Sequence, residues 1–247
     1  MLCDVEWLKQ KCEWYNSTTG HLKGYNCPKC KNRGDFAFIY EGYEMYRDCE
    51  CMKVRNAIRN ANNSGLANTF KANQISNYEA KEDWQQDVLK KAKSFVNSNK
   101  YWYCILGESG SGKTHICTGI ARELLLKGMG VKYMRWVEDS NKLKACINEP
   151  NMYENLLDSF KNADVLYIDD LFKIEPTSAD IKLAYELLNF RYSQAKANKK
   201  RYVTMISSER TFRKLMEYDT AIAGRINEMC GEYLISVFGK EKNRRIH

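Results

Sequence analysis

The first 63 residues combine two patterns of apolar positions. Val5, Leu8 and Cys12 recur at helical spacing, which predicts a short amphipathic helix over residues 4–15. Apolar and polar residues then alternate on both sides of Glu41-Gly42, a pattern typical of a β-hairpin. Its alternating positions are Phe36, Phe38, Tyr40, Tyr43, Met45 and Arg47. A basic helix follows and is expected to end at Asn63-Ser64-Gly65.

The rest of the chain alternates between predicted helices and predicted strands. Residues 64–77 lack a clear period and are expected to link residues 1–63 to a larger domain, residues 78–247. Strands are predicted at 101–106, 131–136, 164–169 and 202–207. Helices are predicted at 82–97, 113–127, within 138–161, at 178–197 and near 211–230. This order indicates an α/β domain whose parallel sheet is flanked by helices on both faces.

Composition and charge indicate the cellular compartment but do not identify the function. The 247 residues contain no apolar run long enough for a membrane span and no signal-peptide pattern at the start, so we expect no membrane. Ten cysteines without an export signal indicate a reducing compartment, which makes the cytoplasm the expected location. The net charge of +8 fits a nucleic-acid partner but also many other soluble proteins.

A glycine-rich loop follows the first strand of the larger domain. Its residues are Gly107, Glu108, Ser109, Gly110, Ser111, Gly112, Lys113 and Thr114, which match G-x-x-x-x-G-K-[ST]. Small residues allow backbone N–H groups to converge on a β-phosphate, while Lys113 neutralises the phosphates and Thr114 offers a hydroxyl to Mg²⁺. A coincidental glycine-rich turn is the weaker alternative, because an apolar strand precedes the loop and a helix follows it.

Two carboxylates end the strand predicted at 164–169. Asp169 is the candidate for holding Mg²⁺, and Asp170 is the candidate for orienting or deprotonating the attacking water. Such a pair can also simply begin a polar loop, but the phosphate-binding loop upstream favours the catalytic interpretation.

Four cysteines bracket the predicted hairpin as a C-x-x-C pair and a C-x-C pair. Two turns that each offer two thiolates suit tetrahedral Zn²⁺, so Cys27, Cys30, Cys49 and Cys51 are predicted to form a zinc-ribbon-like site. Free thiols or a redox pair remain alternatives, and His21 is a substitute ligand. The other six cysteines are expected to pack in the core.

With these motifs and Ala221–Ile226 in their present order, the chain resembles the DnaC/DnaI-like replicative helicase loaders, in particular the phage type. These are AAA+ ATPases related to DnaA and IstB, and the resemblance covers residues 64–247. It implies a loader that uses ATP and Mg²⁺ to deliver the hexameric replicative helicase onto single-stranded DNA. It also implies a homo-oligomeric ring or spiral, a bacterial or phage-infected cell, and a zinc module within residues 1–63 that docks the helicase.

The resemblance also assigns roles to single residues. Residues 107–114 become the Walker A loop and Asp169-Asp170 the Walker B pair. Ser208 or Glu209 takes the sensor 1 position, and Arg225 becomes the arginine finger that reaches a neighbouring subunit's γ-phosphate.

Two departures from the family pattern stand out. Asp170 stands where Glu is usual, so hydrolysis is expected to be slow and to depend on assembly or DNA. The carboxyl-terminal lid is absent or vestigial, and Arg244 or Arg245 is the stand-in for its sensor 2 arginine.

Two sets of residues are candidates for contact with DNA. Lysines in the segment between the second predicted strand and the strand that ends in Asp169 can bind phosphates, and hairpin aromatics can stack on bases. The lysines are Lys142, Lys144 and Lys161, and the aromatics are Phe36, Phe38, Tyr43 and Tyr46. A solvated helix face and a small core, respectively, explain the same residues without DNA. A transposase-helper ATPase of the IstB type and a small-molecule P-loop kinase remain the alternative functions.

Overall fold

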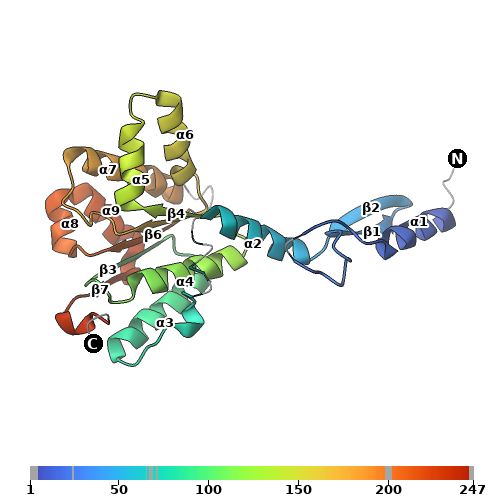
Figure 1. Ribbon diagram of the computed structural model, residues 1–247, viewed down its shortest axis with the longest axis horizontal. Helices are drawn as coiled ribbons and strands as arrows, with labels where there is room; N and C mark the ends of the chain where they lie inside the picture. The colour runs from blue at the N-terminus through green and yellow to red at the C-terminus, as the bar shows by residue number, and fades with distance from the viewer. Residues whose placement is uncertain are drawn as a thin grey trace. The chain divides into compact units, whose positions relative to one another are not determined.

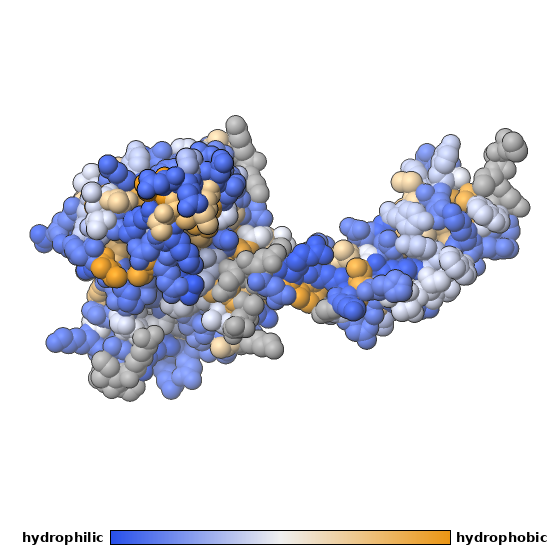
Figure 2. All heavy atoms as spheres, turned by 45° about the horizontal axis from the view of Figure 1, so that its top comes forward, coloured by the Kyte–Doolittle hydropathy of each residue, from blue (hydrophilic) through white to orange (hydrophobic). Residues whose placement is uncertain are grey.

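The computed structural model describes residues 5–23, 25–64, 66, 69–70, 72–197 and 202–244. The chain divides into two compact units, an amino-terminal one that extends to Asn60 and a larger one that contains most of the rest. Hydrophilic residues cover most of the visible surface of both units (Figure 2). Within the described residues, no helix is both long and apolar enough to span a membrane.

The amino-terminal unit is a helix packed on a two-stranded hairpin. Helix α1 (Val5–Ser17) precedes the antiparallel strands β1 (Asp35–Tyr40) and β2 (Tyr43–Asp48), as the apolar patterns predict (Figure 1). Glu41 and Gly42 both have positive φ, which suits the right-handed twist of a two-residue hairpin turn. The side chain of Asn16 brackets Ala37, donating to its carbonyl and accepting from its N–H, so α1 is fixed to the edge of β1.

Helix α2 (Cys51–Ser64) begins at the last cysteine of the hairpin module. Arg55 on this helix is buried, and its guanidinium donates to the carbonyls of Lys23 and Tyr25 and to Asn32 Oδ1. One long side chain therefore ties α2 to the loop that carries the first cysteine pair.

The larger unit is a five-stranded parallel sheet between two helical layers. The strand order is β4-β5-β6-β3-β7, and all pairs in it are parallel. The strands are β3 (Trp102–Gly107), β4 (Val131–Arg135), β5 (Val165–Asp169), β6 (Val203–Ser208) and β7 (Leu234–Val237). Every residue of β3, β5 and β6 is buried, as expected for central strands covered on both faces.

Helices cover both faces of this sheet (Figure 1). The α-helices are α3 (Asp83–Asn97), α4 (Lys113–Leu126), α5 (Trp136–Ala145), α6 (Pro150–Lys161), α7 (Ser178–Lys196), α8 (Phe212–Tyr218) and α9 (Thr220–Cys230). Short 3₁₀ turns lie at Ile75–Asn77, Gly231–Tyr233 and Lys240–Lys242. The main apolar core lies between the sheet and the layer of α5 to α9, and α3 and α4 lie against the opposite face. The predicted α/β class is therefore confirmed.

Strand β7 is the element that the sequence pattern did not predict. It has four residues and pairs with β3, so that Val237 lies opposite Gly107. A Cβ atom on Gly107 would come within 2.5 Å of the Val237 carbonyl oxygen. The first residue of the phosphate-binding motif must therefore be glycine, because β7 lies directly against it.

Candidate functional site

The carboxyl ends of neighbouring parallel strands bring the predicted residues to one edge of the sheet. A cavity of about 320 Å³ opens there, which we call the P-loop cavity. Its lining residues are Asn73, Ser109, Gly110, Gly112, Lys113, Thr114, His115, Asp170, Lys173 and Glu209. A crevice at this edge of an open α/β sheet is the usual place for a ligand.

The glycine-rich loop connects β3 to α4 and points its backbone into the P-loop cavity. Gly110 and Gly112 both have positive φ, which a side chain would strain. The Nζ of Lys113 donates to the carbonyls of Gly107 at 2.9 Å and Glu108 at 2.7 Å, and burial lowers the pKa of Lys113. These carbonyl bonds are weaker partners than phosphate oxygens, so this lysine can transfer to a phosphate.

Asp169, at the end of β5, lies in a cluster of hydroxyl donors. Tyr133 donates to its Oδ2 at 2.7 Å, Tyr167 donates to its Oδ1 at 2.7 Å, and Ser207 makes a short bond to the same Oδ1. Burial raises the pKa of both tyrosines, with the Asp169 charge adding to it, so they remain donors. Three donors on one buried carboxylate fix its orientation.

Thr114 completes the candidate magnesium site. Its Oγ1 lies 3.4 Å from Asp169 Oδ1, across the gap between α4 and β5. A hydroxyl and a carboxylate are hard oxygen ligands of the kind that Mg²⁺ prefers. Thr114 lines the P-loop cavity and the Asp169 carboxylate lies within reach of its hydroxyl, so the donor set fits a magnesium ion held together with phosphates.

Asp170 follows in a left-handed backbone conformation, with φ of 57°. Its Oδ2 accepts a 2.7 Å bond from Lys173 Nζ, and the same Nζ lies 3.5 Å from Glu209. All three side chains line the P-loop cavity. The structure therefore brings Asp170 and Glu209 together and adds a lysine between them that the sequence motifs did not single out.

The sensor 1 candidates, Ser208 and Glu209, lie at the end of β6 and directly after it. Strand β6 lies between β5 and β3 in the sheet. Ser208 Oγ donates to the Leu171 carbonyl at 2.6 Å, whereas Glu209 lines the P-loop cavity. The preceding residue, Ser207, is the one whose hydroxyl reaches Asp169. Sequence spacing does not single out the Ser207 hydroxyl, because its contact with Asp169 joins residues 38 positions apart on neighbouring strands.

The candidate for the arginine finger and the candidates for the sensor 2 arginine belong to different segments of the chain. Arg225, on α9, packs over the rings of Tyr185 at 4.8 Å and Tyr192 at 5.5 Å, and is not among the residues that line the P-loop cavity. Arg244 donates its backbone N–H to the Gly110 carbonyl at 3.2 Å, and its guanidinium lies 4.6 Å from the Tyr78 ring. Arg245 lies outside the described residues.

Three further lining or neighbouring residues had no motif to mark them. Tyr133 lies on β4, Asn73 in the segment predicted as a linker, and His115 directly after the motif. The His115 Nε2 lies within hydrogen-bond distance of the Gln74 carbonyl and of Asn77 Oδ1. The position of His115 next to Thr114 was the one available signal.

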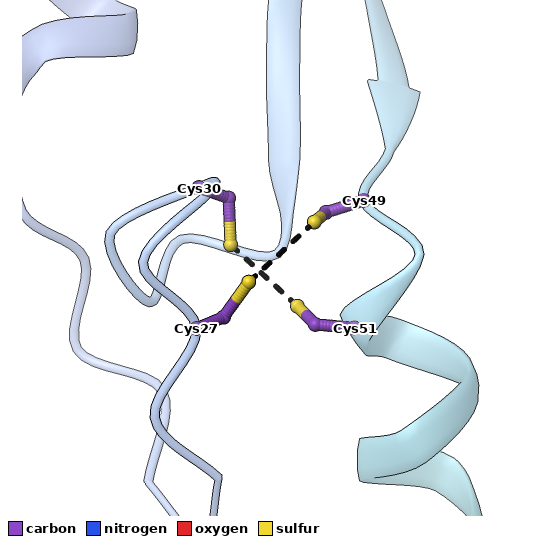
Figure 3. Close-up of side chains that lie close together, drawn as sticks. All are labelled: Cys27, Cys30, Cys49 and Cys51. Atoms are coloured by element: carbon purple, nitrogen blue, oxygen red, sulfur yellow. Dashed lines mark hydrogen bonds between the residues drawn. The ribbon is translucent and has the colours of Figure 1, made fainter.

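The four predicted metal ligands converge in the amino-terminal unit, and we call them the Cys cluster (Figure 3). Their sulfur atoms all lie within 4.8 Å of one another, with Cys27–Cys49 at 3.8 Å and Cys30–Cys51 at 3.5 Å. Four sulfurs at about 2.3 Å from a central zinc stand about 3.8 Å apart at the corners of a tetrahedron. The Cys cluster therefore has the dimensions of a zinc site.

Protonation of the Cys cluster is uneven. Burial alone would raise the pKa of the Cys30 thiol, but the Gly34 N–H and the Cys51 thiol donate to its sulfur and lower that pKa to about 6. Burial raises the pKa of Cys51 to about 12. A bound metal would favour the thiolate form of all four. His21 is exposed and is not part of the group found within the described residues.

The candidate DNA contacts have partners within the protein. The three lysines form ion pairs, Lys142 with Asp139, Lys144 with Asp180 and Lys161 with Glu186. On the hairpin, Phe36 packs against the Cys cluster, whereas Tyr43 is 73% exposed. The small-core interpretation therefore accounts for Phe36, and Tyr43 remains free for contact.

Comparisons with known proteins agree on one family. The model of IstB-like ATP binding proteins matches residues 47–223. The phage-like element PBSX protein XkdC of Bacillus subtilis (strain 168) is 33% identical over 239 residues, covering 90% of this chain and 86% of XkdC. The replicative helicase loader DnaC of Escherichia coli (strain K12) is 29% identical over 131 residues, about half of each chain.

A search of solved structures supports the fold. The crystal structure of the DnaC helicase loader superposes with a TM-score of 0.58 and 18% identity, over 70% of this chain and 99% of that one. The larger unit therefore has the AAA+ P-loop fold, with a nucleotide and Mg²⁺ implied at the P-loop cavity and ATPase activity as its chemistry. The family match covers well over half of the sequence, and the chain belongs to the IstB-like ATP binding proteins.

Proposed function

We propose that this protein is an ATP-dependent loader that delivers a hexameric replicative DNA helicase onto single-stranded DNA when replication starts. The observation that carries its nucleotide chemistry is the Thr114–Asp169 pair, whose side-chain oxygens lie 3.4 Å apart, with Thr114 and Lys113 both lining the P-loop cavity. The similarity to DnaC of Escherichia coli supports the loading role, and the Cys cluster unit offers a separate body for the partner. The setting is the cytoplasm of a bacterial or phage-infected cell.

In this proposal each residue of the site has one role. Lys113 leaves the Gly107 and Glu108 carbonyls and binds the β- and γ-phosphates, while Thr114 and Asp169 hold Mg²⁺. A magnesium ion held by Thr114 and Asp169 would supply positive charge to neutralise the phosphates. Asp170 orients the attacking water, and because its side chain is one methylene shorter than glutamate, turnover is slow.

In this proposal hydrolysis depends on assembly because Arg225 is not among the residues that line the P-loop cavity of its own subunit. The guanidinium rests on Tyr185 and Tyr192 of α7 and is absent from the lining of the P-loop cavity. In a ring or spiral of subunits it would serve as the arginine finger of the neighbouring site. Glu209, rather than the Leu171-bonded Ser208, is the sensor 1 candidate that faces the cavity.

The amino-terminal unit is the proposed helicase-docking part. Trp7 is 53% exposed and Trp14 is 67% exposed on α1, so large apolar side chains are available for a partner. Single-stranded DNA would contact the α5–α6 region, where Lys142, Lys144 and Lys161 must exchange carboxylate partners for phosphates.

Co-purification with the cognate helicase, in ATP and in ADP, tests this function. The full chain is expected to retain the helicase in a nucleotide-dependent way, and Trp7→Ala with Trp14→Ala is expected to weaken capture. Met216→Ala, which removes a 46% exposed side chain from α8, is the matched control. Equal binding of the double variant and the control would show that α1 is not the docking element.

The family match keeps the transposase-helper function as the second candidate. A helper of that kind would bind duplex DNA and would not retain a replicative helicase. ATP hydrolysis stimulated by duplex DNA, with no helicase in the eluate, would therefore select it. A small-molecule kinase is disfavoured because the lining of the P-loop cavity, within the described residues, includes no arginine for an acceptor phosphate.

A further inference from the structure

The loop that follows Asp169 is held in a strained conformation by the end of β6. Asp170 and Phe172 both have positive φ, at 57° and 55°, although neither is glycine. Left-handed backbone at a bulky residue such as phenylalanine costs energy and persists only where the surroundings over-determine it. This loop places the side chains of Asp170 and Lys173 at the P-loop cavity.

Hydrogen bonds from β6 and its flank fix nearly every backbone group of residues 170–173. The backbone carbonyl of Ser207 accepts from the Leu171 N–H, and the Ser208 hydroxyl donates to the Leu171 carbonyl. Arg210 donates through Nε to the Phe172 carbonyl at 2.7 Å and through its terminal nitrogen to the Lys173 carbonyl at 2.9 Å. The backbone of Lys173 is therefore held at its carbonyl and also at its N–H, which donates to the Asp170 carbonyl.

Packing fixes the same loop from the other side. The Phe172 side chain is 1% exposed and makes edge contacts with the rings of Trp136 at 5.4 Å and Tyr218 at 5.6 Å. With Phe172 buried, Lys173 is left on the cavity side of the loop, where it lines the P-loop cavity. The strain is thus the condition for placing Asp170 and Lys173 together at one site.

The partners of Lys173 locate its charge within the cavity. Its Nζ lies 2.7 Å from Asp170 Oδ2 and 3.5 Å from Glu209. The hydrogen bond that Lys173 donates to Asp170 raises the pKa of Lys173, so it stays a cation. Asp170 is the carboxylate proposed to orient the attacking water, which must stand next to the γ-phosphate. A cation in contact with Asp170 is therefore at the γ-phosphate end of the cavity.

We propose that Lys173 is a second phosphate-binding lysine of this site, one that contacts the γ-phosphate of ATP and so distinguishes ATP from ADP within a single subunit. This proposal rests on the proposed nucleotide site. It assigns a phosphate contact to a residue outside the glycine-rich loop and the Asp169-Asp170 pair. Lys113 reaches the phosphates from the glycine-rich loop, and Lys173 reaches the terminal phosphate from the loop after β5. When it does so it releases Asp170, which is then free to orient water.

Binding of a non-hydrolysable ATP analogue and of ADP, each with Mg²⁺, tests the proposal. Lys173→Met keeps the length of the side chain and removes its charge. We expect about a tenfold loss of affinity for the ATP analogue, or about 1.4 kcal/mol, with ADP affinity changed less than about twofold. Lys173→Arg is expected to restore most of the preference. Lys91→Met, which breaks the Lys91–Asp87 pair on α3, is the control and should change neither affinity.

Three outcomes would overturn the proposal. One is an equal loss of affinity for both nucleotides, and another is no loss for either. The third comes from Lys173→Met combined with Glu209→Gln: if the double variant binds the ATP analogue as the unchanged protein does, Lys173 only neutralises Glu209 and does not contact phosphate. If the unchanged protein binds neither nucleotide, it is the proposed nucleotide site that fails. A circular dichroism melt of each variant confirms that it is folded.

Discussion

Removal of one thiolate from the Cys cluster is expected to unfold the amino-terminal unit and to leave the nucleotide site intact. The perturbation is Cys27→Ser, which replaces a buried sulfur in a set whose members lie within 4.8 Å of one another. Cys146→Ser, at a partly buried cysteine outside the Cys cluster, is the matched control.

The size of the effect follows from how little else stabilises this unit. Within its described residues the buried apolar side chains, apart from the Cys cluster, are Leu8, Cys12 and Ala37. Burial of a leucine contributes about 1.5–3 kcal/mol, and the two smaller side chains contribute less. A structural zinc ion contributes about 10–16 kcal/mol, which equals or exceeds the whole stability of a typical domain. Without the ion the unit should therefore lose its fold.

Metal analysis and limited proteolysis together provide the assay. The unchanged chain and Cys146→Ser should each carry one zinc ion, and Cys27→Ser nearly none. Protease should then cut within residues 5–60 of Cys27→Ser while a fragment containing the larger unit survives and still binds ATP. The reasoning is refuted if the purified chain holds no zinc and its amino-terminal unit nonetheless resists protease.

Three other substitutions test the larger unit. Lys113→Ala should abolish ATP binding in a fluorescence titration, because no other lysine lies on the glycine-rich loop itself. Arg225→Ala should leave ATP binding unchanged and remove the DNA-stimulated part of hydrolysis; normal turnover in the assembled protein would exclude the finger role. Arg191→Met should lower the free energy of unfolding by about 3–5 kcal/mol in urea, because this fully buried guanidinium donates to four carbonyls and one hydroxyl that would lose their partner.

The sequence predicts those features whose residues are near one another along the chain. The glycine-rich loop, the Asp169-Asp170 pair and the two cysteine pairs each fit within a few positions, so spacing alone indicates their chemistry. The alternation of helices and strands similarly predicts the parallel sheet. Strand β7 is not predicted, because its four residues, which follow a 3₁₀ turn, are too few to show a period of apolar positions.

Contacts across the sheet cannot be predicted in this way, because they depend on strand order. Tyr133 lies opposite Tyr167 in the register of β4 and β5, and Ser207 reaches Asp169 only because β6 lies next to β5. Tyr133 lies 36 positions from Asp169 and Ser207 lies 38 positions from it, so sequence spacing does not indicate these two contacts. The ion pair of Lys144 is equally hard to predict, since its partner Asp180 lies 36 positions away, whereas Lys142 pairs with Asp139 three positions before it on the same helix.

The placement of the cations decides between the candidate chemistries. Lys113 and Lys173 belong to the lining of the P-loop cavity, whereas Arg225 rests on tyrosines of α7 with its Nε buried and without a hydrogen-bond partner. A kinase that closes over a small acceptor needs its arginine at its own phosphates. In the proposed function, a subunit that binds ATP with Lys113 and Lys173 and holds Arg225 on α7 would complete its site with a second copy. This arrangement would make hydrolysis depend on assembly, as we propose for the loading function.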